Sequence, residues 1–82
     1  LLTFPTEFPI KVMGRREEGF AQWVADVVQR HAPDFNPALL EMRPSKNGNF
    51  LSVTATIVAT SKSQIDAIYL ELTADKRVLM AL

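Results

Sequence analysis

The most informative stretch for the fold is SKNGNFLSVTATIVAT, residues 45–60. Its Asn47-Gly48 dipeptide is the pair that best tolerates the positive φ angles of a tight hairpin turn. The residues that follow alternate in character. The apolar side comprises Leu51, Val53, Ala55, Ile57 and Ala59. The other side carries mainly hydroxyls and comprises Phe50, Ser52, Thr54, Thr56 and Val58. This period of two predicts a half-buried strand that forms the second arm of a hairpin.

The first arm of the hairpin lies just before this turn. Leu40 and Met42 alternate there with Glu41 and Arg43, and Pro44 interrupts the pattern. Because proline has no N–H to donate to a ladder, this arm is predicted to be an edge strand.

Two amphipathic helices flank the hairpin. The first is predicted from Glu17 to His31, with Glu17 and Glu18 in its first turn and Arg30 and His31 in its last, where each charge suits the helix dipole. Its apolar stripe comprises Phe20, Trp23, Val24, Val27, Val28 and His31. The second is predicted to begin at Ser61, with Gln64 at the capping-box spacing. Its buried stripe comprises Ile65, Ile68, Tyr69 and Leu72.

A strand is predicted at each end of the chain. In FPTEFPIKVMG, residues 4–14, two prolines keep residues 3–9 extended, and a strand over residues 10–13 ends at Gly14. The final RVLMAL, residues 77–82, predicts a short strand. The resulting order is βαββαβ, which predicts an α+β, ferredoxin-like domain over residues 1–82 with an extended segment at 1–8. Its four antiparallel strands are expected in the order 4-1-3-2, with both helices on one face.

The composition excludes several classes of function. Nine Lys and Arg balance nine Asp and Glu, so no net charge attracts nucleic acid or an acidic membrane surface. An RNA-binding sheet would also need stacking aromatics where Asn49 and Leu51 are expected. No apolar run is long enough to cross a membrane. Without cysteine there is no thiolate nucleophile and no Cys-containing metal site, and a cytoplasmic location is the default. We expect no metal and no cofactor.

An enzymatic role would depend on His31, the single histidine of the chain. Its place before Pro33 indicates the last turn of a helix, where an imidazole can bond free carbonyl groups. The alternative is a catalytic or ligand role, but no acidic or nucleophilic residue has a spacing that indicates a catalytic set. MGRREEG, residues 13–19, is a weak signal for acyl-phosphate hydrolysis, because a single glycine at the strand end indicates a phosphate site only weakly. The following Glu17 and Glu18 also oppose an anion. We therefore expect a protein that is not an enzyme.

The candidate sites are a ligand site and an interaction surface. Gly14, where a backbone can approach a ligand closely, precedes Arg15 and Arg16, which could bind a carboxylate. A tight turn at Gly14 followed by a solvated charged loop is the alternative. The candidate interaction residues are Met13, Glu41, Arg43 and Leu70. Met13 and Leu70 are expected to be exposed apolar side chains.

FPIKVMG, VVQRHAP and SKNGNFLSVTATIVAT, in this order, resemble the YbeD-like family of small bacterial proteins of unknown function. The resemblance covers almost the whole chain, although the turn in SKNGN is one residue longer than expected. It implies a cytosolic protein whose fold is similar to the ACT regulatory domains of amino-acid biosynthetic enzymes. Family genes often lie beside genes of lipoate metabolism, which implies a regulatory role there.

Two functions from different classes follow. The first is a regulatory domain that binds a small metabolite near Gly14, Arg15 and Arg16 at an interface between subunits. On this hypothesis, a bulky residue at position 14 should abolish binding without unfolding the chain. The second is an adaptor that docks on a protein partner through an edge strand or the open sheet face. Homodimerisation is possible, because exposed edges invite pairing while Pro44 and nearby charges oppose it.

Overall fold

The structure is a computed structural model that describes residues 3–82, so Leu1 and Leu2 of the predicted extended segment lie outside the described residues. The elements are β1 (Thr6–Arg15), α1 (Phe20–His31), the short 3-10 helix η1 (Pro37–Leu39), β2 (Glu41–Pro44), β3 (Phe50–Ala59), α2 (Lys62–Thr73) and β4 (Val78–Ala81).

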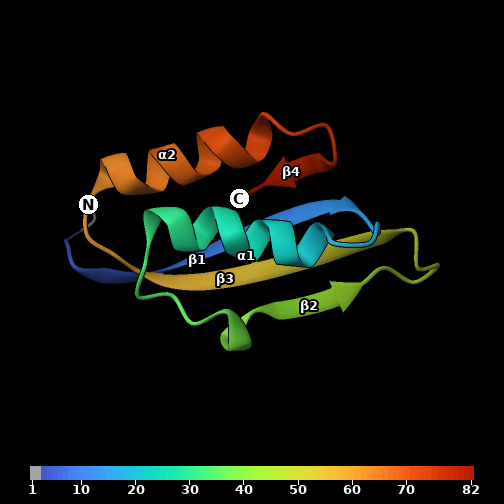
Figure 1. The fold of residues 1–82 in the computed structure, drawn as a ribbon, viewed down its shortest axis with the longest axis horizontal. Coiled ribbons are helices and arrows are strands. Elements are labelled where there is room, and N and C mark those ends of the chain that lie inside the picture. The colour runs from blue at the N-terminus through green and yellow to red at the C-terminus, as the bar shows by residue number, and fades with distance from the viewer. Residues whose placement is uncertain (1–2) are drawn as a thin grey trace.

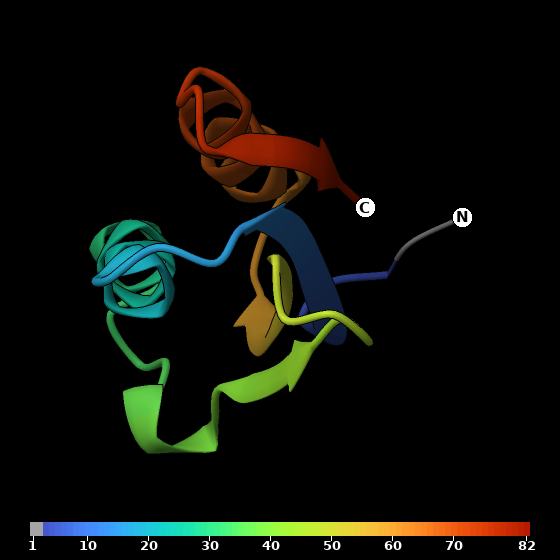
Figure 2. The ribbon, with the colours of Figure 1, turned by 90° about the vertical axis from the view of Figure 1, so that its right-hand side faces the viewer.

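The four strands form one antiparallel sheet in the order β2-β3-β1-β4, and both helices cover the same face of it (Figure 1; Figure 2). The predicted ferredoxin-like fold and strand order are therefore confirmed. The long central pair runs from Thr6 opposite Ala59 to Arg15 opposite Phe50. β2 lies at an edge of the sheet, as Pro44 indicated.

The core lies between the helices and the apolar sides of β1 and β3. Its fully buried large side chains are Ile10, Val12, Phe20, Val24, Val27, Val28, Val53, Ile57, Ile68 and Leu72. No polar side chain is buried in residues 3–82. The opposite face of the sheet has no helix over it and is called here the open face (Figure 2).

β1 is longer than predicted at both ends, because it starts at Thr6 and continues through Gly14 to Arg15. Pro9 is tolerated inside the strand because its nitrogen faces the edge that β4 does not reach. Lys11, two residues later, has the same orientation, and its N–H donates to the carbonyl of Leu82 over 3.0 Å. The prediction that Gly14 ends the strand is wrong.

α1 begins at Phe20 and not at Glu17. Gly19 precedes it with a φ of 82°, a left-handed conformation that costs glycine little. Glu17 and Glu18 are exposed residues of the preceding loop, so the prediction of acidic residues in the first turn is wrong. The basic residues of the last turn, Arg30 and His31, are confirmed.

The connection between β2 and β3 spans residues 45–49, which is longer than a two-residue turn. Positive φ occurs at Gly48, with a φ of 77°, and the N–H of Ser45 donates to the carbonyl of Phe50 over 2.9 Å. Phe50 and Ser52 lie on the open face, whereas Leu51 packs against the core. The assignment of Asn49 and Leu51 to stacking positions is therefore corrected.

α2 begins as predicted. The hydroxyl of Ser61 accepts a hydrogen bond from the N–H of Gln64 over 3.1 Å. The return bond differs from a standard capping box, since Gln64 Oε1 accepts from the N–H of Thr60 over 2.8 Å. Tyr69 is half-buried and packs edge-on against Phe8. Leu70 is 74% exposed, as expected.

Candidate functional site

The open face of the sheet carries a cluster of charged and hydroxyl side chains from three strands. Strand register places Lys11, Thr54 and Glu41 across the sheet at one level, and Met13, Ser52 and Arg43 at the next. Since the side chains of a strand alternate between faces, these residues all face away from the helices.

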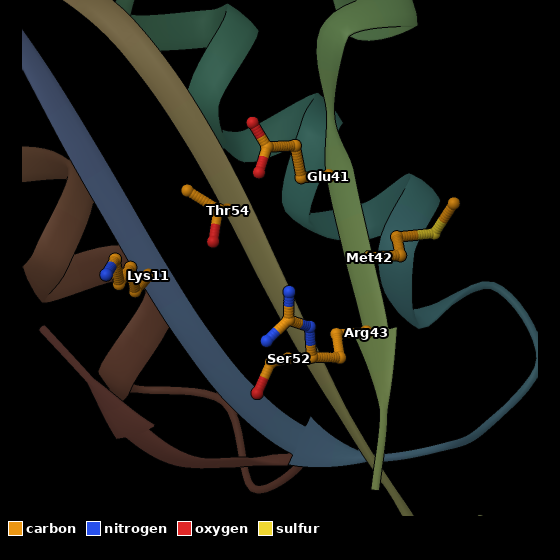
Figure 3. Close-up of a pocket in the computed structure, with 6 residues that line it drawn as sticks. All are labelled: Lys11, Glu41, Met42, Arg43, Ser52 and Thr54. Atoms are coloured by element: carbon orange, nitrogen blue, oxygen red, sulfur yellow. The ribbon is translucent and has the colours of Figure 1, made fainter.

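These residues surround a depression of about 370 Å³, called here the trough, which is lined by Lys11, Glu41, Met42, Arg43, Ser52 and Thr54. Figure 3 shows Glu41 and Arg43 reaching from β2 toward β3, while Met42 points away from them. The hydroxyls of Ser52 and Thr54 lie between these charges and Lys11 on β1 (Figure 3). The trough thus brings two cations and one carboxylate around two hydroxyl groups.

Among residues 3–82, the charged side chains of the trough form no ion pairs with one another. The four ion pairs found in residues 3–82 join Arg30 and His31 to Glu71, Lys62 to Asp66, and Arg77 to Asp75. Lys11, Glu41 and Arg43 belong to none of them. Their charged groups are available to a ligand, and the excess of one positive charge favours an anion.

Four of the predicted site residues line two separate depressions. Glu41 and Arg43 line the trough. Arg15 and Arg16 line a wider depression of about 630 Å³ with Glu17, Asn49 and Phe50, called here the arginine pocket. Arg16 is held there by its N–H, which donates to the carbonyl of Asn49 over 3.0 Å.

Gly14 does not face either depression. It is buried, and a Cβ atom built on it would lie 2.5 Å from the carbonyl oxygen of Arg77 and 2.5 Å from the Phe20 ring. This glycine is required by close packing. A bulky residue at position 14 therefore cannot test binding separately from folding, contrary to the expectation from the sequence.

Lys11, Ser52 and Thr54 are site residues that the sequence reasoning did not single out. Their alternation with buried residues showed that they face outward, but a single strand pattern does not show which outward residues become neighbours. The signal that could have found Lys11 is its position as a lone cation within an apolar strand, between Ile10 and Val12.

His31 is engaged in contacts between the two helices. Its Nε2 lies 2.8 Å from Oε1 of Glu71, which also pairs with Arg30. The backbone carbonyl of His31 accepts a hydrogen bond from Gln64 Nε2 over 2.8 Å. The end of α1 is thereby fastened to α2, which agrees with a structural role for His31 at a helix end.

A second ion pair fastens the turn before β4. The Asp75 carboxylate accepts from Arg77 Nε over 3.0 Å and from the N–H of Arg77 over 2.9 Å. The Arg77 guanidinium also lies 4.6 Å from the centre of the Trp23 ring. The side-chain hydrogen bond from Arg77, with the backbone bond and its charge, holds the pKa of Asp75 below its ordinary value.

Low pH is expected to weaken the ion pair between Asp75 and Arg77. Because the pKa of Asp75 is lower in the folded chain, ionised Asp75 stabilises the fold above the ordinary carboxyl pKa of about 4, and this stabilisation is lost as pH falls through the folded-state pKa. Asp75→Asn should therefore lower the Tm at pH 7, with a difference from the natural chain that shrinks toward pH 2. Thermal melts followed by circular dichroism measure it, with exposed Asp34→Asn as the control. A Tm difference independent of pH would contradict the assignment.

The comparisons with known proteins agree with this architecture. A family model described as a protein of unknown function, DUF493, matches residues 1–82. The chain belongs to this family. A member from Nitrosomonas europaea, UPF0250 protein NE1487, is 46% identical over 82 residues, which cover all of this chain and 94% of that protein. A UPF0250 protein from Ectopseudomonas mendocina is 52% identical over 99% of this chain and 89% of its own length. The resemblance to a bacterial family of unknown function is confirmed.

Two solved structures share the fold of the present chain. Protein HP0495 from H. pylori superposes with a TM-score of 0.79 at 17% identity, covering 100% of this chain and 86% of that one. The ACT domain from the GTP pyrophosphokinase of Chlorobium tepidum superposes with a TM-score of 0.69 at 15% identity, covering 93% and 84%. The predicted likeness to ACT domains is thus confirmed for the fold. Within residues 3–82, neither helix has the length and apolar character needed to cross a membrane.

Proposed function

We propose that this protein is a non-enzymatic regulatory domain that binds a small organic anion in the trough of the open face. The observation that carries the proposal is the convergence of Lys11 and Arg43 from strands on either side of β3, over the hydroxyls of Ser52 and Thr54. A carboxylate can be held between an ammonium and a guanidinium group. Glu41 can accept a hydrogen bond from a donor elsewhere on the same ligand.

The regulatory part of the proposal is supported by the likeness to an ACT domain. The non-enzymatic part is supported by the engagement of His31 with Glu71 and Gln64, which occupies the one histidine in a helix junction. The proposed setting is the cytoplasm, and lipoate metabolism is the pathway with which the family resemblance associates it.

The trough is preferred to the arginine pocket as the place of binding. Both depressions hold two cations and one carboxylate, but the arginine pocket is larger, and its two cations are adjacent residues at the end of β1 and in the loop that follows. In the trough, the two cations come from different strands whose register is set by β3. Arg15 and Arg16 provide a second place for the same class of ligand, and substitutions distinguish the two.

A thermal-shift screen against organic anions tests this function. Amino acids, nucleotides, lipoate and octanoate form a suitable set. A ligand at a hundred times its Kd stabilises the fold by about 2.7 kcal/mol, which for a domain of this size raises Tm by about 10 °C or more. We expect Lys11→Gln and Arg43→Gln each to remove most of this shift. Exposed Lys76→Gln, in the turn before β4, is the matched control and should keep it.

Two results would contradict the proposed site. In the first, no anion in the set raises Tm of a protein that melts cooperatively. In the second, the shift survives Lys11→Gln and Arg43→Gln but is lost in Arg15→Gln or Arg16→Gln, which would move the ligand to the arginine pocket.

A protein adaptor is the second candidate function, favoured by the exposure of every residue of the edge strand β2. Met42 on this strand is 58% exposed, although its register places it opposite buried Val53. A partner strand could add to this edge and read its alternate side chains.

For the adaptor, the double reversal Glu41→Lys with Arg43→Glu should abolish capture of a partner by the immobilised protein. The natural chain and Lys62→Glu with Asp66→Lys, a double reversal at an exposed ion pair of α2, should both retain the partner. Quantitative pull-down with these three proteins is the measurement. Equal recovery of the partner by the double variant would place the interface elsewhere.

A further inference from the structure

An apolar depression adjoins the trough on the open face. This hollow has a volume of about 180 Å³ and is lined by Lys11, Val12, Met13, Ser52, Thr54, Met80 and Leu82. Lys11, Ser52 and Thr54 line both depressions, so the two share a border. Beyond that border, the side chains of Met13, Met80 and Leu82 provide a continuous apolar surface.

The positions of these side chains are set by the pairing of β1 with the end of the chain. Met13 lies opposite Met80. Lys11 and Leu82 exchange two backbone hydrogen bonds, of 3.0 and 2.7 Å. The one cation of the hollow therefore lies beside Leu82, and the two methionines lie at the next level of the sheet.

We infer that the open face binds an amphipathic organic anion, with its carboxylate in the trough and a short unbranched apolar tail in the hollow. This inference rests on the proposed function and names the chemical class of its ligand. Lys11 is the border residue, because a lysine can present its aliphatic stem to the tail while its ammonium group meets the carboxylate.

Polarity and size both favour this class of ligand. Single exposed apolar side chains are normal on a protein surface, but here three are contiguous and end at a cation. Methionine adapts its shape to an apolar guest because its side chain is unbranched and polarizable. With about 30 Å³ for each water-sized group, the hollow has room for about six carbon atoms. A dianionic head is disfavoured by the carboxylate of Glu41 in the trough.

The test is a titration of the ¹⁵N-labelled protein with straight-chain carboxylates, followed by amide chemical shifts. Acetate, butanoate, hexanoate and octanoate are the probes, each below its aggregation concentration. Complete burial of a methylene tightens Kd by about fourfold. We expect Kd to fall about two- to fourfold per methylene up to about six carbons and then to level off. Hexan-1-ol, which has the tail without the charge, should bind at least about tenfold more weakly than hexanoate.

Two substitutions separate the head from the tail. Met80→Gln should abolish the dependence of Kd on chain length and leave the affinity for acetate unchanged. Lys11→Gln should weaken binding of every carboxylate. Leu79→Gln is the matched control, because Leu79 is 53% exposed beside Met80, which is 51% exposed, yet does not line the hollow. It should behave like the natural chain.

The outcomes distinguish this inference from the proposed function. The inference is supported if Kd depends on chain length in the natural protein and this dependence is lost in Met80→Gln. The ligand should also shift the amide signals of Met13, Ser52 and Met80. If anions bind through Lys11 and Arg43 but their affinity does not rise with added methylenes, the inferred tail site is wrong. The proposed function then still holds. If neither the carboxylates nor the wider set of anions bind, both fail.

Discussion

Phe20→Ala is expected to cost about 3–5 kcal/mol of unfolding free energy, the loss typical of a buried aromatic side chain. Phe20 begins α1, is fully buried, and lies under Gly14 of β1 and beside the Trp23 ring, with ring centres 6.0 Å apart. A domain of this length has a total stability of about 4–12 kcal/mol. The substitution should therefore leave much of the protein unfolded, which urea denaturation followed by circular dichroism measures.

Phe50→Ala is the matched control for this prediction. It removes the same side chain from the open face, where Phe50 is 36% exposed. We expect a smaller loss there, of about 1–2 kcal/mol, because the Phe50 ring is only partly shielded from water. Equal losses at the two positions would show that the core does not lie where the fold places it.

Gly14→Ala should be nearly as damaging, although it adds a single methyl group. Its Cβ would meet the Arg77 carbonyl oxygen at 2.5 Å and two atoms of the Phe20 ring at 2.5 and 2.8 Å. The ring can shift, but the carbonyl belongs to the backbone that pairs with β1, since the N–H of Arg15 donates to it over 3.2 Å. We expect a cost of about 3 kcal/mol, the upper part of the usual range for an overpacked core, and a drop in Tm of more than about 10 °C.

A double-mutant cycle identifies the cause of this loss. If the Phe20 ring is part of the obstruction, Gly14→Ala combined with Phe20→Leu should cost less than the sum of the two single changes. Met13→Ala, at the adjacent position on the open face, controls for the effect of changing β1 itself. A Gly14→Ala variant as stable as the natural chain would return Gly14 to the role of an accessible ligand residue.

The candidate site was predictable in part. Edge position and alternation singled out Glu41 and Arg43, and both line the trough. Arg15 and Arg16 were grouped with Gly14 because they are adjacent in sequence, but Gly14 points to the core while the arginines line a depression at the sheet end. Adjacent residues of a strand face opposite sides, so nearness along the chain was misleading here.

Local patterns in the sequence were enough to predict the order of the elements, the buried side of each strand and the ferredoxin-like arrangement. Alternation, helical spacing and the Ser61 cap are local signals, and each acts within a few residues. Which outward residues become neighbours depends on the pairing of distant strands. One residue of slip in strand pairing moves every side chain to the other face, and the register depends on the hairpin loop and on core packing. The trough joins Lys11 to Glu41 and Arg43 across β3, and the hollow joins Met13 of β1 to Met80 of β4, because distant strands pair at these levels.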